Sequence, residues 1–146
     1  MTELRLLSIE DDINVAALIC RVAQESGFAA RTAFGTQIEK AYEEFQPDVI
    51  VLDIMMPDMD GIEVLQYLRE RCCRSHIVIM SGSDGLSRRI VERMGNSLGF
   101  TIIANMTKPF RVPALRAVFE ETKAKLESAA TTLPQKPGDE LAQGVA

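Results

Sequence analysis

Four apolar runs in this sequence are each followed by a residue whose side chain could take part in chemistry. The runs are 4–9, 49–52, 77–80 and 100–104, and the residues that follow them are Glu10 with Asp11, Asp53, Ser81 and, a few positions further on, Lys108. Carboxylates that meet at one place repel one another unless a cation or a proton lies between them. Oxygen ligands suit Mg²⁺, which keeps several of its waters when it binds a protein. The pattern therefore predicts a Mg²⁺ site if the runs are neighbouring strands.

Asp53 is the residue of this set that is best suited to react covalently. A carboxylate can attack a phosphoryl group and form an aspartyl-phosphate. Lys108 would then offer a positive charge and Ser81 a hydroxyl donor to the phosphoryl oxygens, while Mg²⁺ neutralises the remaining charge. Taken singly, Ser81 reads as a turn residue, Lys108 as a surface lysine and Asp12 as the N-cap of the next helix. The cap role is kept for Asp12, but the joint appearance of Ser81 and Lys108 with the acids at the other strand ends favours phosphoryl transfer to Asp53.

Segments with helical periodicity alternate with strand-like runs along the chain. The expected strands are 4–9, 28–32, 49–52, 77–80 and 100–104. The expected helices are 13–26, 36–45, 62–71, 86–94 and 112–129. Five strands alternating with five helices imply right-handed crossovers and a parallel sheet with helices on both faces. Ligands of such sheets bind outside the carboxyl ends of the strands, where the polar residues above are expected.

Composition limits the class of protein further. With 146 residues, 47% of them hydrophobic and 25% charged, the chain fits one globular domain. We expect that domain to span 1–130, followed by a flexible tail or the start of a linker over 131–146, which lacks an apolar period. The net charge of −5 argues against direct nucleic-acid binding. No membrane-length apolar stretch and no signal-peptide layout is present, so we expect a cytoplasmic protein.

Four blocks of sequence resemble the receiver domain of two-component response regulators. They are 6–12 (LLSIEDD), 49–61 (VIVLDIMMPDMDG), 79–82 (IMSG) and 107–110 (TKPF). One block alone would be weak evidence, but the four stand in the right order on the right elements, and the likeness covers about residues 4–128. It implies a flavodoxin-like (βα)5 doubly wound parallel sheet with strand order 2-1-3-4-5.

The resemblance also implies roles for particular residues. Asp53 would accept a phosphoryl group from a histidine kinase or a histidine phosphotransfer protein. Glu10, Asp11 and Asp53 would hold Mg²⁺, with the backbone carbonyl of Met55 completing the metal shell. Lys108 and Ser81, already singled out for their chemistry, would bind the phosphoryl group.

The expected readout of phosphorylation departs from the family pattern. Ser81, Gly82 and Asn105 occupy the switch positions, but the family usually has an aromatic residue where Asn105 stands. The segment between Ser81 and Lys108 is longer than is typical. Residues 98–104 within it resemble receivers joined to cyclic-di-GMP phosphodiesterase (EAL) domains.

Three functions remain open on the sequence. The first is a phosphorelay switch, which is not an enzyme beyond its own phosphoryl transfer and slow autodephosphorylation. Its target protein or output domain is expected on the surface of helix 86–94, strand 100–104 and helix 112–129, where a second copy forming a homodimer is also an expected partner. The second is the N-terminal regulatory module of a longer output protein, for example in cyclic-di-GMP turnover. The third is a Mg²⁺-dependent aspartyl-phosphate hydrolase, which is disfavoured because Met55 replaces the second carboxylate that such enzymes require.

Overall fold

A computed structural model of the chain describes residues 3–54, 61–71, 73–82, 89, 93, 96–97 and 99–132. The strands are β1 Arg5–Ile9, β2 Ala29–Ala33, β3 Val49–Asp53, β4 His76–Ser81 and β5 Thr101–Thr107. The helices are α1 Ile13–Glu25, the short 3-10 helix η1 Gly35–Gln37, α2 Ile38–Phe45, α3 Gly61–Glu70 and α5 Val112–Thr132. Most of the expected helix 86–94, together with Met55 and the end of the chain from 133 onward, lies outside the described residues.

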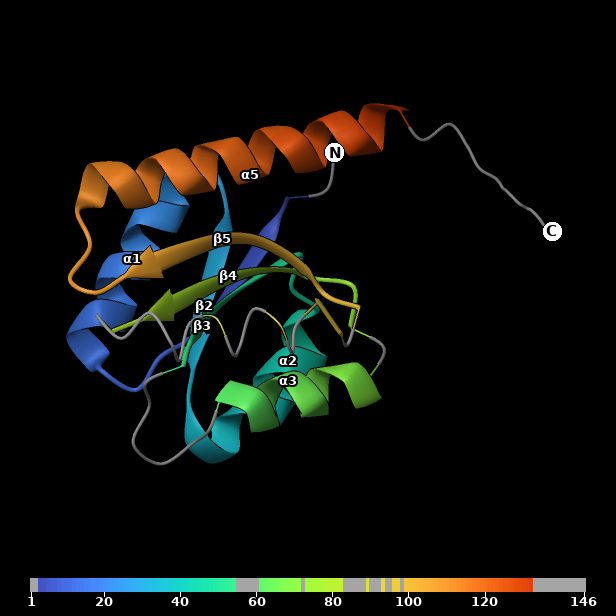
Figure 1. Ribbon diagram of the computed structural model, residues 1–146. Coiled ribbons are helices and arrows are strands. Elements are labelled where there is room, and N and C mark those ends of the chain that lie inside the picture. The colour runs from blue at the N-terminus through green and yellow to red at the C-terminus, as the bar shows by residue number, and fades with distance from the viewer. Residues whose placement is uncertain are drawn as a thin grey trace, which may run out of the picture.

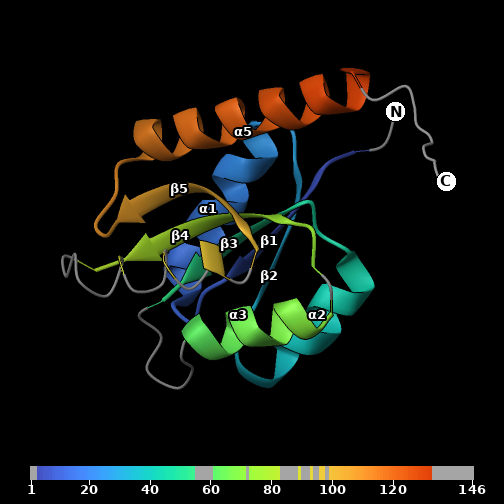
Figure 2. The same cartoon turned by 45° about the vertical axis from the view of Figure 1, so that its right-hand side comes forward.

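The five strands form one parallel sheet in the order β2-β1-β3-β4-β5. Helices α1 and α5 cover one face of this sheet, and α2 and α3 cover the other (Figures 1 and 2). The predicted doubly wound α/β fold with strand order 2-1-3-4-5 is therefore confirmed. All strands point the same way, so their carboxyl ends meet at a single edge, on the left of Figure 1.

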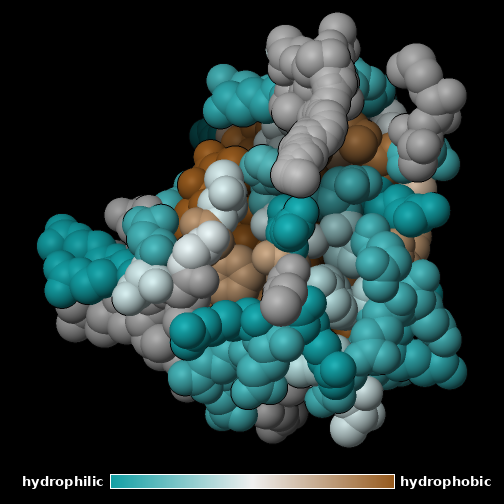
Figure 3. Space-filling view, turned by 90° about the vertical axis from the view of Figure 1, so that its right-hand side faces the viewer, coloured by the Kyte–Doolittle hydropathy of each residue, from teal (hydrophilic) through white to brown (hydrophobic). Residues whose placement is uncertain are grey.

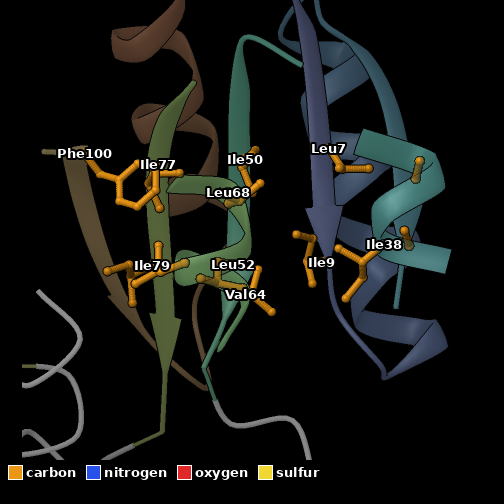
Figure 4. Close-up of a cluster of buried hydrophobic side chains, with 13 residues drawn as sticks. Leu7, Ile9, Ile38, Ile50, Leu52, Val64, Leu68, Ile77, Ile79 and Phe100 are labelled. Carbon is orange, nitrogen blue, oxygen red and sulfur yellow. The ribbon is translucent and has the colours of Figure 1, made fainter. Parts of the chain in front are cut away.

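The core consists of two apolar layers, one on each face of the sheet. Alternate residues of the strands enter different layers, as the two-residue period of a strand requires. Toward α2 and α3, strand residues such as Ile50 and Ile77 pack against Leu68 (Figure 4). Toward α1 and α5, Val51 packs in the layer that contains Phe119. Every residue of β3 is buried, because both of its faces and both of its edges are covered.

Helix α1 begins at the predicted residue and ends at Glu25, one residue before the predicted end. The carboxylate of Asp12 accepts hydrogen bonds from the backbone N–H groups of Asn14 and Val15, so Asp12 is the N-cap. Gly27, with a φ of +98°, lies just past the end of the helix. The N–H of Phe28 donates to the carbonyl of Ala23 at 3.0 Å, which completes the usual glycine-terminated helix end.

Strand β5 is longer than its apolar run predicts. The run ends at Ala104 because Asn105 is polar, but pairing with β4 continues through Asn105 to Thr107. A register shift between Ile77 and Val78 of β4 leaves Ile103 as an extra residue in β5. With that shift, Thr107 pairs with the last residue of β4, and Lys108 follows directly at the edge of the sheet.

Seen from the amino ends of the strands, hydrophilic side chains cover most of the part formed by α2 and α3 (Figure 3). Among the described residues, no helix has the length and apolarity needed to cross a membrane.

Candidate functional site

The predicted site residues lie at the carboxyl edge of the sheet. Glu10 follows β1, Asp53 is the last residue of β3, Ser81 is the last residue of β4, and Lys108 follows β5. Parallel pairing of neighbouring strands brings these positions together. The backbone N–H of Lys108 donates to the carbonyl of Ser81 at 2.6 Å, which fixes Lys108, the first residue after β5, against the end of β4.

The ammonium group of Lys108 bridges two buried carboxylates. Its Nζ lies 2.7 Å from Oε1 of Glu10 and 2.8 Å from Oδ2 of Asp53. Glu10 and Asp53 are only 1% and 2% exposed, whereas the side chain of Lys108 is 25% exposed. Two buried negative charges would be costly without such a cation. The lysine therefore holds the two acids in place and remains open to solvent on one side.

Glu10, Asp11 and Asp53 form a cluster in which one oxygen of each lies within 4.8 Å of the others. Three carboxylate oxygens at this spacing match the preference of a hard divalent cation, and Mg²⁺ in particular binds through a few carboxylates and retains waters. Asp11 is only half-buried, so the cluster is open to solvent. The residues present thus fit the Mg²⁺ site that the sequence predicts.

Protonation equilibria at the site are shifted by burial and by ion pairing. Burial raises the pKa of Glu10 from 4.5 to about 7. The hydrogen bond from Lys108 opposes this increase, and the nearby carboxylate of Asp53 adds to it. For Lys108 burial lowers the pKa, but its hydrogen bonds to Asp53 and Glu10 outweigh burial and leave the pKa above 10.5. Lys108 is therefore charged at neutral pH, while Glu10 titrates close to it.

The hydroxyl of Ser81 is buried and has no hydrogen-bond partner among the described residues. Buried hydroxyls usually have a hydrogen-bond partner, so one without a partner at a cluster of reactive groups calls for an explanation.

The other predicted site residues are less buried or lie outside the described residues. Gly82 follows Ser81 directly and is half-buried. Asn105 is half-buried in β5 opposite Ile79, on the sheet face covered by α2 and α3. The proposed metal ligand Met55 lies outside the described residues.

Two backbone features of the site are not evident from the predicted list of site residues. The N–H of Asp12 donates to Oε2 of Glu10 at 3.1 Å, a backbone contact that residue type alone does not indicate. Gly61, the first residue of α3, lies so close to the end of β3 that a Cβ there would come within 2.9 Å of the Ile54 side chain. Glycine at this position lets α3 begin directly beside the strand that carries Asp53.

Comparisons with known proteins assign a chain with this fold and this site to one family. The family model of the response regulator receiver domain matches residues 6–120. The cell cycle response regulator CtrA of Brucella ovis is 32% identical over 137 residues, which cover 88% of this chain and 56% of that protein. The chain belongs to the receiver domain family of response regulators, which are signalling proteins of two-component systems.

Solved structures agree with this assignment. A response regulator from Colwellia psychrerythraea has a TM-score of 0.73 at 26% identity, covering 85% of this chain and 99% of that one. The signal receiver domain of a response regulator from Bermanella marisrubri has a TM-score of 0.70 at 25% identity, covering 82% and 98%. The chain therefore matches these structures over nearly their whole length, but spans only about half the length of the curated relatives.

Proposed function

We propose that this chain is a phosphorylation-dependent signalling switch whose acceptor is Asp53. The observation that carries the proposal is the bridge made by Lys108 between Glu10 and Asp53 beside a third acid, Asp11. Such a set combines a nucleophilic carboxylate, a fixed positive charge and oxygen ligands for a hard cation. Membership of the receiver family supports the same conclusion.

In the proposed reaction, a carboxylate oxygen of Asp53 attacks the phosphorus of a phosphohistidine on a histidine kinase or histidine phosphotransfer protein. The new P–O bond forms as the P–N bond breaks, and the imidazole nitrogen keeps the electron pair and takes up a proton. Lys108, already 2.8 Å from Asp53, balances charge on the phosphoryl oxygens as they arrive. The hydroxyl of Ser81, which has no partner among the described residues, donates to one of those oxygens.

Glu10, Asp11 and Asp53 are the proposed Mg²⁺ ligands, together with the carbonyl of Met55. Bound Mg²⁺ would supply charge neutralisation for the phosphoryl oxygens. The chain's own contribution is to hold the three carboxylates at close range, which Lys108 does at Glu10 and Asp53. Lys108 is shared between these acids and the incoming group, so its contacts are the ones that phosphorylation changes first.

Phosphorylation is proposed to act on partners through the β5 side of the domain. It adds close to two negative charges at Asp53 and draws Lys108 and Ser81 toward the new group. Because Lys108 follows β5 and bonds to the end of β4, this movement reaches Gly82 and the strand that carries Asn105. The surface of β5 and α5, with the segment 86–94, is the proposed contact for an output domain, a target protein or a second copy.

A longer natural protein is the second form of this proposal, with the receiver as its regulatory module. The curated relatives are longer than this chain, which covers 56% of the CtrA sequence of Brucella ovis. Helix α5 continues to Thr132 and leads toward the segment expected to be a tail or linker. The link to cyclic-di-GMP phosphodiesterase domains stays a prediction from residues 98–104.

A thermal-shift titration tests the proposed site. Because a ligand that binds only the folded state raises the unfolding temperature, Mg²⁺ should raise it for the wild type. Mg²⁺ with beryllofluoride, which mimics the phosphoryl group, should raise it further. Asp11→Asn should lose most of both responses, whereas Asp48→Asn, at the other edge of the sheet, should keep them. A wild type that responds to neither ligand would show that the proposed site is wrong.

A further inference from the structure

We propose that Asp12 is a positioning residue: by capping α1 it orients the carboxylate of Glu10 for binding the divalent cation. The inference rests on the proposed function, since it assigns Asp12 a part in the same site. Asp12 is exposed and is not in the cluster formed by Glu10, Asp11 and Asp53. It therefore acts through Glu10 rather than as a ligand.

The Asp12 side chain fixes the first turn of α1. Its Oδ1 accepts from the N–H of Asn14 at 2.9 Å and from that of Val15 at 3.2 Å. Its carbonyl accepts from the N–H of Ala16 at 2.8 Å. The side chain and the carbonyl of Asp12 thus bind successive donors of the helix. The only backbone group of Asp12 that remains is its own N–H.

That N–H points back to the site and donates to Oε2 of Glu10 at 3.1 Å. The other oxygen of Glu10, Oε1, accepts from Lys108 at 2.7 Å. The backbone N–H of Glu10 donates to the carbonyl of Ala33 at 3.2 Å. Glu10 is therefore held at its backbone and at both carboxylate oxygens, and the contact at Oε2 depends on the backbone geometry that the cap imposes.

The contact with Asp12 becomes the more important one once the site is used. Lys108 is shared with Asp53 and must also meet the phosphoryl group, so its hold on Glu10 is not constant. The Asp12 N–H belongs to a turn fixed by the helix and does not have to move. Groups that orient a metal ligand typically affect metal affinity tenfold or more when they are lost, about 10–100-fold in studied sites.

Calorimetric titration of the full chain with MgCl₂ distinguishes a positioning role of Asp12 from an effect of its charge and from an effect on the stability of α1. Asp12→Ala removes the cap, while Asp12→Asn keeps a good N-cap and removes the charge. Ser26→Ala is the matched control, because Ser26 lies at the other end of α1 and its Oγ donates to the carbonyl of Val22 at 2.9 Å. We expect Asp12→Ala to weaken Mg²⁺ binding about tenfold, and the other two variants to stay close to the wild type.

A second readout is phosphorylation by acetyl phosphate at varied Mg²⁺. The Asp12→Ala variant should need about tenfold more Mg²⁺ for half-maximal rate, with the rate at saturating Mg²⁺ nearly unchanged. Equal weakening by Asp12→Asn would assign the effect to charge, and equal weakening by Ser26→Ala would assign it to helix stability; either result overturns the inference. Wild-type affinity in Asp12→Ala also overturns it while leaving the proposed function intact. A wild type that does not bind Mg²⁺ would overturn both.

Discussion

An aspartate lies at each end of β3. Backbone hydrogen bonds to neighbouring strands hold Asp48, whereas an ion pair with Lys108 holds Asp53. Asp48, at the amino end, accepts from the backbone N–H of Arg5 at 2.9 Å and donates its own N–H to the carbonyl of Arg5 at 2.8 Å. Its carbonyl accepts from the N–H of His76 at 2.9 Å. Asp53, at the carboxyl end, is buried against a second acid and depends on Lys108 for charge balance.

The same contrast extends to the serines of the two edges. Ser75, at the amino edge, is buried and donates to the carbonyl of Pro47 at 2.6 Å. Ser81, at the carboxyl edge, is buried without a partner in the described part of the chain. The amino edge therefore uses its polar groups to fasten neighbouring strands. The carboxyl edge keeps buried charges and a hydroxyl that has no partner in the part of the chain that the structure describes. A ligand can bind such groups, and functional sites often break packing rules in this way.

Among variants that keep the acceptor Asp53, Lys108→Ala should have the largest effect on function. Lys108→Ala should slow phosphorylation by phosphoramidate about 100-fold, since losing one electrostatic contact to the transition state commonly costs that much. Lys40→Ala is the control, because Lys40 is exposed and lies 3.9 Å from its partner Glu44. A Lys108→Ala rate within about twofold of the Lys40→Ala rate would mean that Lys108 contributes no more to phosphorylation than an exposed surface lysine does.

The two serines should separate stability from activity. Ser75→Ala should lower the free energy of unfolding by about 1–3 kcal/mol, because the buried carbonyl of Pro47 loses its donor. Ser81→Ala should change stability by less than about 0.5 kcal/mol, because no hydrogen bond among the described residues is lost. Phosphorylation should slow only in the Ser81 variant. Urea titration measures stability, and intact mass over time measures the phosphorylation rate. A larger stability loss in Ser81→Ala, or slower phosphorylation in Ser75→Ala, would contradict the comparison.

The buried acid Glu10 should make stability depend on pH. Its pKa is about 7 in the folded chain and 4.5 as an unperturbed group, so the folded state binds more protons between these values. Protonated Glu10 therefore stabilises the folded state at low pH, and this stabilisation is lost as the pH rises through about 7. Without Mg²⁺, Glu10→Gln should be more stable than wild type at pH 8, on the order of 1 kcal/mol, with a smaller difference at pH 5. Urea titrations at both pH values test this, and a difference that grows toward pH 5 would contradict it.

A small effect on stability, and none on phosphorylation, is expected from exposed ion pairs on the α2 and α3 side. Arg71 lies 3.3 Å from Glu43, and both side chains are about half exposed. Glu43→Gln should change the free energy of unfolding by less than about 1 kcal/mol, and less still in high salt. Urea titrations at two salt concentrations measure it. A loss as large as that of Ser75→Ala would mean that surface charge contributes to stability here as much as buried hydrogen bonds do.

The sequence predicted the elements whose signals are local. The buried strand β3 and the Asp12 N-cap of α1 were both found, because burial on both faces and helix capping leave direct traces in residue type. Strand β5 was predicted too short, since pairing with β4 carries it past the polar Asn105. No pattern of residue types shows that an edge strand continues in this way.

For the site, sequence identified which residues gather but not how they are bonded. Strand-end logic placed Glu10, Asp53 and Lys108 at one edge, where the structure has them. The two-way bridge of Lys108 depends on side-chain geometry set by three separate strands. The N–H of Asp12 that holds Glu10 is a backbone donor, which every non-proline residue carries, so residue type alone gives no sign of it.

Asp53 is the proposed phosphoryl acceptor, and Asp48, at the other end of β3, provides the control. Wild type, Asp53→Asn and Asp48→Asn are incubated with phosphoramidate and Mg²⁺ and weighed intact by mass spectrometry. We predict that wild type and Asp48→Asn gain the mass of one phosphoryl group and that Asp53→Asn gains none. Equal gain by Asp53→Asn, or no gain by the wild type, would contradict the assignment.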